Sequence, residues 1–230
     1  MPWASSDLGY EDTKETLHRT QKQVEQAKTI VIGGGGPTGV EVAGELGFEY
    51  GLNKEITLVT AGSQLLVGLP PHIASFAENE LRKMHVDVLK DVKVISSTVL
   101  ENGKTLVTLS NKTTKEVDLY LPTIGVVPNT DFIPKELLDS KNEVVVDEFL
   151  RAKGVDDIWA AGDASALQSN QLVYAVPQTT HLNRNLDLFL HGEPLVAYKS
   201  DGARELTLSL SFPSVTLLHI LCARILAKIF

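Results

Sequence analysis

Glycines with a regular spacing follow the apolar run Thr29–Ile32 and are the strongest chemical signal in this sequence. The spacing Gly34-x-Gly36-x-x-Gly39 is typical of a turn that binds a dinucleotide. Gly34 permits the tight turn, Gly36 lets backbone approach a pyrophosphate, and Gly39 lets the next helix pack closely on the strand. That helix would direct N–H groups and its positive dipole end toward the phosphates. A purely structural turn is the alternative.

Two polar residues near this turn are candidate contacts for the nucleotide. Glu41, in the first turn of the predicted helix, could orient a nicotinamide or simply complement the helix dipole. Thr60 stands where NAD-specific sites usually carry an acid for the ribose 2′-hydroxyl. It is followed by Ala61-Gly62-Ser63, and no arginine is near for a 2′-phosphate. The sequence therefore does not choose between NADH and NADPH.

Two further candidates lie later in the chain. Asp163 follows Gly162 at the end of a predicted strand. His181 lies on a predicted helix, where it would serve as a general acid or base, or else face solvent without a catalytic role. The spacing of residues reveals no Ser/His/Asp constellation and no cluster of metal ligands.

The elements that would position these residues indicate an α/β fold. A polar helix is predicted from about Asp12 to Ala27, and the periodicity after the glycine turn predicts a helix reaching Tyr50. The strand Glu55–Thr60 completes a strand–helix–strand unit with a parallel, right-handed crossover. A second helix is predicted from His72 to Met84.

An antiparallel meander is expected next, built from the segments Val92–Leu100, Thr105–Ser110 and Val117–Leu121. The later part of the chain is predicted to hold two short strands and a helix, at Glu143–Asp147, Asp157–Asp163 and Val176–Leu190. The fold class is thus a Rossmann-like nucleotide-binding domain with a parallel sheet and a meander, followed by a second segment.

Composition narrows the class of partner. The 230 residues carry a net charge of −8, which argues against nucleic acid because phosphate backbones require a basic face. The single cysteine, Cys222, excludes a disulfide framework, and residues 1–6 show no secretory signal. We therefore expect a cytoplasmic protein that acts on a small molecule.

The C-terminal stretch Leu206–Ala223 has no formal charge. Alternation from Leu206 to Phe212 predicts a half-buried strand, and Pro213 separates it from an apolar helix. This helix would contribute to the core or to a homo-oligomer contact, with peripheral membrane attachment as the alternative. A membrane span is not expected.

Three motifs in this order, Gly34–Glu41, Thr123–Asn129 and Trp159–Asp163, resemble the pyridine nucleotide-disulfide oxidoreductase superfamily. The similarity is greatest to its apoptosis-inducing-factor-like and ferroptosis-suppressor-like branch of NAD(P)H flavoenzymes. It covers roughly residues 20 to 200.

The resemblance implies roles for particular residues. Gly34, Gly36, Gly39 and Thr60 would belong to an NAD(P)H-binding domain, with Glu41 near the nicotinamide and Gly125 lining the nucleotide site. Gly162 and Asp163 would belong to a discontinuous FAD domain, in which the acid holds a ribityl hydroxyl. His181 would lie on a helix that faces the flavin region.

The sequence departs from that family at its N-terminus. Residues 1–28 carry no strand and glycine turn for the ADP half of FAD. The predicted organisation is a leader with a helix (1–27), an NAD(P)H-binding-like domain (28–135), a partial FAD-domain-like segment (136–200) and an apolar strand and helix (201–230). We expect NAD(P)H as the cofactor, and FAD bound tightly only with help from a partner chain.

Three functions remain open at this level. The first is an NAD(P)H-dependent oxidoreductase that acts on a quinone-like or aromatic small molecule. The second is a truncated flavoenzyme scaffold repurposed as an isomerase, cyclase or lyase, in which a vacated flavin cleft holds a small metabolite and His181 is central. The third is a non-catalytic remnant.

Overall fold

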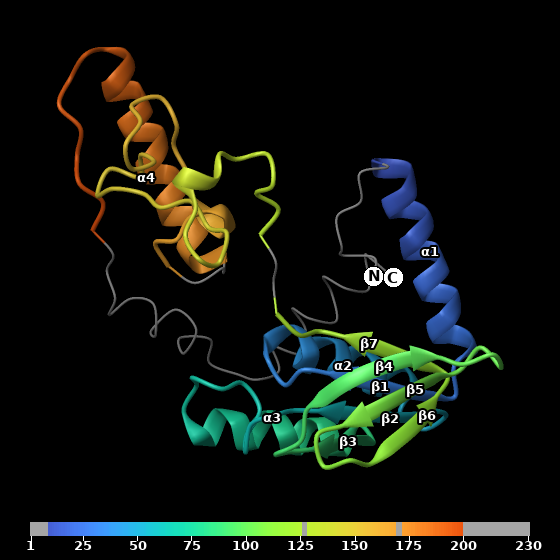
Figure 1. The fold of residues 1–230 in the computed structure, drawn as a ribbon. Helices are drawn as coiled ribbons and strands as arrows, with labels where there is room; N and C mark the ends of the chain where they lie inside the picture. The colour runs from blue at the N-terminus through green and yellow to red at the C-terminus, as the bar shows by residue number, and fades with distance from the viewer. Residues whose placement is uncertain (1–8, 126–127, 169–171, 200–230) are drawn as a thin grey trace. The chain divides into compact units, whose positions relative to one another are not determined.

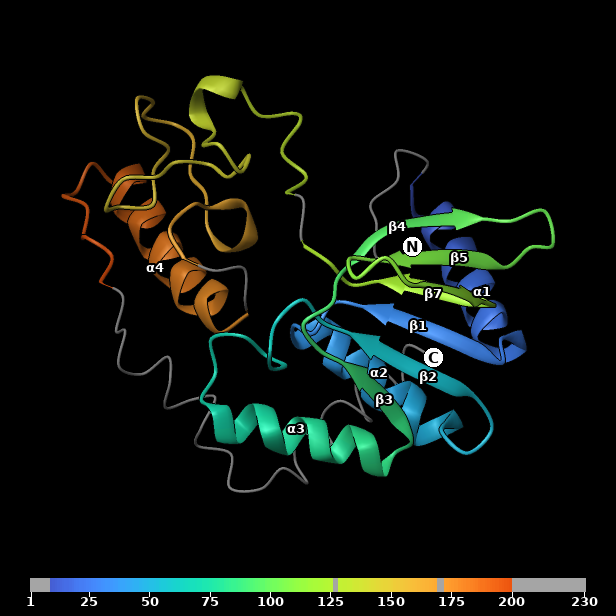
Figure 2. The ribbon, with the colours of Figure 1, turned by 60° about the horizontal axis from the view of Figure 1, so that its bottom comes forward.

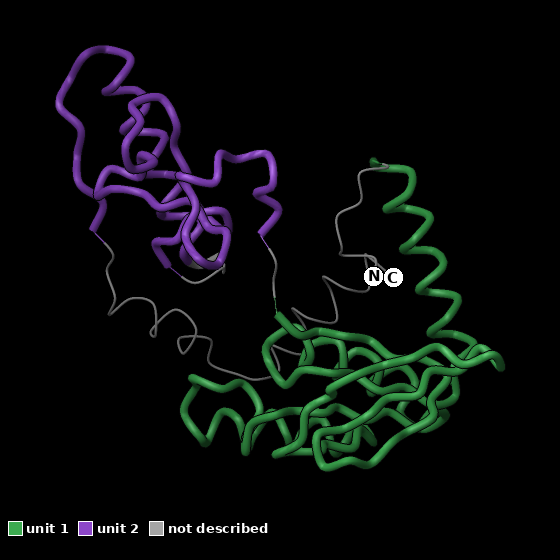
Figure 3. Tube along the Cα trace, viewed as in Figure 1, with its two compact units in different colours: residues 1–125, 218–230 green, residues 126–217 purple. Residues whose placement is uncertain are grey.

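The computed structural model describes residues 9–125, 128–168 and 172–199, which fall into two compact units (Figure 3). The division lies between residues 125 and 126. Residues 128–135, grouped with the nucleotide-binding domain by the sequence, therefore belong to the second unit. Each unit has its own hydrophobic core.

The first unit is a three-layer α/β structure (Figure 1). In chain order it comprises α1 (Tyr10–Gln26), β1 (Thr29–Gly33), α2 (Pro37–Tyr50), β2 (Glu55–Val59), α3 (Pro71–Lys83), β3 (Val86–Leu89), β4 (Val94–Val99), β5 (Thr105–Leu109), β6 (Thr114–Val117) and β7 (Leu119–Pro122).

A parallel sheet with the order β3-β2-β1-β7 forms the middle layer. Helices α2 and α3 cover one face, and the antiparallel meander β4-β5-β6 covers the other (Figure 2). Because the sheet is covered on both faces, β1 and β2 are buried over four of their five residues and read as continuous apolar runs.

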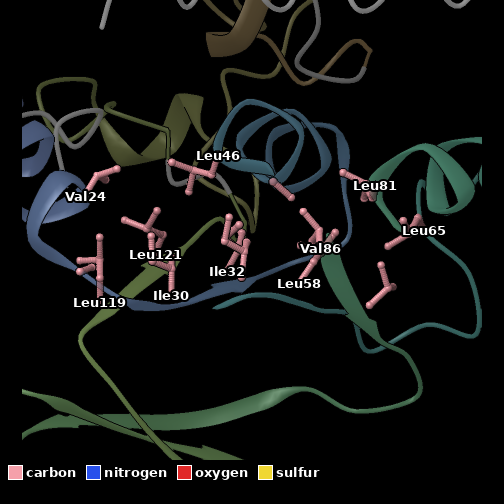
Figure 4. Close-up of a cluster of buried hydrophobic side chains, with 14 of the residues drawn as sticks. Val24, Ile30, Ile32, Leu46, Leu58, Leu65, Leu81, Val86, Leu119 and Leu121 are labelled. Carbon is pink, nitrogen blue, oxygen red and sulfur yellow. The ribbon is translucent and has the colours of Figure 1, made fainter. Parts of the chain in front are cut away.

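Alternating side chains of the sheet supply both cores of this unit. Ile30 and Ile32 point toward the helices and pack with Leu46 of α2 (Figure 4). Val31, between them, belongs to the cluster on the opposite face, where it packs with Val107 of the meander. This alternation follows from the two-residue period of a strand and fixes the register of β1.

The predicted boundaries of the first three helices and of the first two strands agree with the structure to within a few residues. The sequence missed β3, whose inward residues Val86 and Val88 are too few to give a clear pattern. The predicted strand Val117–Leu121 was assigned to the meander, and this assignment was wrong for most of its length. The meander ends with β6, and after Asp118 the chain enters the parallel sheet as β7, beside β1.

The second unit contains the 3₁₀ turns Lys135–Leu137 and Gly162–Ala164 and the helix α4 (Leu172–Leu190). The predicted short strands at 143–147 and 157–163 form only isolated bridges, such as Val144 with Ser165. Helix α4 begins earlier than predicted and includes Pro177. The core of this unit comprises Leu137, Val144, Val146, Leu150, Ala152 and Ala160.

Candidate functional site

The parallel sheet has a topological switch point between β1 and β7. From β1 the chain proceeds through α2 to β2 on one side, whereas β7 joins on the other side after the meander. In open α/β sheets, ligands bind in the crevice at the carboxyl ends of the strands that flank such a point. The glycine turn after β1 and Thr123 after β7 lie at that edge.

Hydrogen bonds from both neighbouring strands hold the glycine turn in place. The N–H of Gly34 donates to the carbonyl of Val59 at the end of β2 (2.8 Å). The N–H and the hydroxyl of Thr123 both donate to the carbonyl of Gly33 (2.8 and 2.9 Å). On the far side of the turn, the N–H of Leu66 donates to the carbonyl of Gly35 (2.7 Å). The turn is therefore a rigid part of the sheet edge.

The three motif glycines meet different constraints. Gly34 has φ of 126°, a value that favours glycine, and a Cβ there would lie 2.7 Å from the carbonyl oxygen of Thr123. A Cβ on Gly39 would collide with the carbonyl oxygen of Gly34, so this glycine brings α2 close to the turn.

Gly36 differs from the other two because its backbone conformation is open to any residue. Its φ is −76° and its ψ is −177°, and a Cβ built there meets nothing within 4 Å. Packing within the protein therefore gives no reason for a glycine. Close approach of a ligand to the backbone does give one, and Gly36 is the N-cap residue of α2. Pro37 occupies the first turn of this helix, where its missing N–H costs nothing.

Glu41 lies on the exposed face of α2, close to its N-terminus. Although the residue is exposed overall, burial of its carboxyl group raises the pKa above the ordinary value of 4.5. A carboxylate at this place could accept a hydrogen bond from an amide N–H of a bound ligand.

Thr60 is buried rather than presented to the ligand edge. Only 4% of its surface is exposed, and a Cβ on Gly35 would collide with its side chain. Its hydroxyl oxygen accepts a hydrogen bond from the N–H of Gly62 (3.4 Å). The side chain of Thr60 therefore packs against the glycine turn at Gly35. The exposed residues after β2 are Ala61 and Ser63.

Gly125 lies two residues beyond Thr123, at the end of the first unit. It is exposed, with φ of 70°, and Ile124 before it is 60% exposed. The backbone after β7 therefore bends at the same sheet edge as the glycine turn. Thr123, which fastens the two strand ends, was quoted within a motif, but its spacing gave no sign of this hydrogen-bonding role.

Gly162 and Asp163 belong to the second unit, whereas the glycine turn belongs to the first. Gly162 has φ of 67°, and its N–H donates to Oε1 of Gln178 on α4 (2.7 Å). Gln178 is 1% exposed and donates in turn to Gln168 (2.9 Å). Asp163 is exposed. A buried amide on α4 thus fixes the loop that presents this acid, and the sequence gave no hint of Gln178.

His181 is engaged in holding the chain after α4. Its Nε2 lies 2.8 Å from the carbonyl oxygen of Val196, which makes this nitrogen the donor, and its ring packs edge-on against Tyr198. Asn185, which is fully buried, donates to the carbonyls of Val196 and Phe149 (2.9 and 3.1 Å). This geometry gives His181 a structural role.

Within residues 9–125, 128–168 and 172–199, no group of three or more His, Cys, Asp and Glu residues could hold a metal ion. Over the same residues, no helix is both long and apolar enough to traverse a bilayer. The predicted C-terminal strand and helix at 206–230, including Cys222, lie outside the described residues.

Comparison with known proteins identifies a family. The model of the pyridine nucleotide-disulphide oxidoreductase family matches residues 7–182. The chain is 40% identical over 197 residues to oxidoreductase ptaL of Pestalotiopsis fici, covering 86% of this chain and 53% of that protein. It is 31% identical to the type II NADH:quinone oxidoreductase of Haemophilus influenzae, covering 85% of this chain and 47% of that one. The chain thus spans about half the length of these relatives.

Solved structures agree with this result at the level of the fold. LpdA from Mycobacterium tuberculosis superposes with a TM-score of 0.62 at 25% identity, over 75% of this chain and 36% of that one. The water-forming NADH oxidase from Lactobacillus brevis, bound to NADH, gives 0.66 at 22% identity, over 83% and 41%. The glycine turn, the switch point and these matches lead to one conclusion: the chain belongs to the pyridine nucleotide-disulphide oxidoreductase family.

Proposed function

We propose that this chain binds NAD(P)H at the turn Gly34–Gly39 and takes part in hydride transfer to a quinone-like or aromatic small molecule. An oxidoreductase role is common to the family and to the relatives that it matches. The observation that carries the nucleotide site is Gly36, whose backbone is unstrained and whose missing side chain leaves open space. The quinone-like acceptor is supported by the Haemophilus relative.

Each part of the edge would have a defined task. The N–H groups at the start of α2 would face the pyrophosphate, where helix dipole and donors favour negative charge. Glu41 would accept a hydrogen bond from the amide N–H of the nicotinamide carboxamide and so orient the ring. Gly125 would allow the chain after β7 to approach the nicotinamide half closely. These residues bind and orient the hydride donor.

The family implies FAD as well as NAD(P)H in general. A flavin would supply the capacity to accept a hydride and to pass electrons on to the acceptor. In the second unit, Asp163 is exposed on a loop fixed by Gln178, which fits an acid offered to a ribityl hydroxyl. The cofactor-independent alternative depends on His181, whose Nε2 is already bonded to Val196. We therefore favour the redox function.

The experiment is calorimetric titration of the purified chain with NADH and NADPH, repeated on Gly36→Ala. The variant should fold with a stability within about 1 kcal/mol of the wild type, because alanine fits this backbone and only the N-cap preference changes. Its affinity should fall at least about tenfold, equivalent to about 1.4 kcal/mol, since the methyl group occupies the pyrophosphate path.

Gly44→Ala is the matched control, because Gly44 lies on the same helix and its added methyl would have its nearest neighbour 3.9 Å away. It should bind as the wild type does. Absence of binding of either nucleotide below millimolar concentration would remove the proposal.

A further inference from the structure

The end of β2 lies beside the loop after β3, and the two are joined by backbone hydrogen bonds. The N–H of Asp91 donates to the carbonyl of Gly62 (3.1 Å), and the N–H of Val92 donates to that of Thr60 (3.1 Å). Residues on the loop after β3 therefore flank the position where an adenosine ribose meets the end of β2. Lys90 directly precedes Asp91 on this loop.

The part of this edge contributed by β2 carries no charge. Thr60 is turned inward against Gly35, and the residues that follow it, Ala61, Gly62 and Ser63, are small and uncharged. A ribose 2′-hydroxyl finds no carboxylate here to accept its hydrogen bond. Residues 61–63 also place no carboxylate against a 2′-phosphate, and the exposed hydroxyl of Ser63 can donate a hydrogen bond to it.

Lys90 contributes positive charge that is only partly neutralised. Its Nζ lies 2.9 Å from Oε2 of Glu78, and Arg82 lies 2.8 Å from Oε1 of the same carboxylate. Two cations share one anion, so the cluster has a formal charge of +1. The side chain of Lys90 is 35% exposed and has a long flexible stem, which would let its ammonium group reach a phosphate at the sheet edge. Asp91, which is exposed on the same loop, is the opposing charge.

We infer that Lys90 is a specificity-determining residue of the nucleotide site and that the chain accepts the 2′-phosphorylated cofactor, NADPH, at least as well as NADH. This inference rests on the proposed function, because it assumes a dinucleotide on the glycine turn. The neutral end of β2 removes the selection against a 2′-phosphate, and Lys90 and Ser63 supply its partners. Spacing along the chain gives no sign of Lys90, because only the backbone hydrogen bonds from Asp91 and Val92 bring the loop after β3 beside the end of β2.

The test compares ligands that differ only in the 2′-phosphate: NADPH with NADH, and adenosine 2′,5′-bisphosphate with adenosine 5′-monophosphate. The wild type should bind the 2′-phosphorylated member of each pair at least as tightly as the member without the 2′-phosphate. In Lys90→Met this member should bind about fivefold more weakly, as expected for a partly exposed ion pair, and the other should be unaffected. Lys90→Arg should restore the affinity, and high salt should weaken the phosphorylated member more strongly.

Lys83→Met is the matched control, since Lys83, the last residue of α3, pairs with a different glutamate of that helix (Nζ to Glu80 Oε1, 2.7 Å). It should leave all four affinities unchanged. Asp91→Asn should tighten the 2′-phosphorylated ligands by removing the opposing charge. Thermal melts establish that each variant is folded.

Two results would overturn the inference. One is a wild type that binds NADH at least about tenfold more tightly than NADPH. The other is a Lys90→Met variant in which both members of a pair change equally, since that points to a structural role for the cluster. Either result would leave NADH binding on the glycine turn in place, whereas failure of every dinucleotide to bind would remove the proposed function too.

Discussion

At the scale of single residues, the glycines at the N-terminus of α2 and within it differ in what an added side chain would contact. Gly36 has free space and an ordinary backbone, so packing within the described residues does not require a glycine there. Gly47, further along α2, is present for packing, because an added Cβ would lie 2.6 Å from Cγ2 of Val86 and 3.1 Å from the carbonyl oxygen of Met84. Gly44 has neither constraint.

Alanine substitutions on α2 should separate these reasons by stability alone. Gly47→Ala should lower the free energy of unfolding by about 1–3 kcal/mol, because the helix must move away from the chain at Met84 and Val86. Gly44→Ala should raise it by about 0.5–1 kcal/mol, the usual advantage of alanine within a helix. Urea denaturation followed by circular dichroism measures both. Equal effects of the two substitutions would contradict this account of α2.

At the scale of elements, one carboxylate connects the two strands that flank the switch point. Oδ2 of Asp118, just before β7, accepts hydrogen bonds from the N–H groups of Lys28 (2.8 Å) and Thr29 (2.9 Å), at the start of β1. These backbone hydrogen bonds, first that of Lys28, lower the pKa of Asp118 below its ordinary 3.8. The side chain is 28% exposed.

A lowered carboxyl pKa means that the folded state prefers the ionised form, so the stabilisation is present above pH 3.8 and is lost as the pH falls through the lowered pKa. Asp118→Asn should therefore destabilise the protein by about 1 kcal/mol at pH 7, since an amide oxygen accepts more weakly than a carboxylate. The difference from the wild type should shrink as the pH falls below 3.8.

Urea denaturation between pH 7 and pH 2.5 measures this change, with Asp87→Asn, an exposed aspartate on β3, as the control. A constant difference between Asp118→Asn and the wild type across this range would argue against the charged hydrogen bonds as the cause.

At the scale of the whole molecule, the glycine turn Gly34–Gly39 belongs to one unit and the loop that contains Gly162 and Asp163 belongs to the other. Each unit has a separate core, and the candidate residues for NAD(P)H all lie in the first. Ligand binding to the turn should therefore stabilise that unit specifically. The residues around Gly162 should retain their own stability, which comes from α4 and the amide of Gln178.

Hydrogen exchange read by mass spectrometry, with and without NADH, can resolve the two units. NADH at about 100 times its dissociation constant should stabilise the first unit by about 2.7 kcal/mol and slow exchange in β1, β2 and α2. Exchange in α4 should be unchanged. Equal protection of both units would show that they respond to the nucleotide together and would contradict this picture.

Local pattern was sufficient for much of the fold. The apolar run of β1, the glycine spacing and the periodicity of α2 predicted the parallel unit, because each depends on residues only a few positions apart. Short elements were not predictable in this way. β3 is four residues long, and β7 is separated from the meander only by the change of direction at Asp118, whose partners Lys28 and Thr29 lie 90 and 89 positions earlier.

The sequence by itself determined the family, the α/β class and the place of the glycine turn between β1 and α2. The tertiary structure decided which residues share a surface. It buried Thr60 under Gly35, bonded His181 to Val196, and placed Lys90 beside the end of β2. The physical reason is that a turn is specified by local backbone conformation, whereas the exposure of a side chain depends on the strands and helices that pack around it.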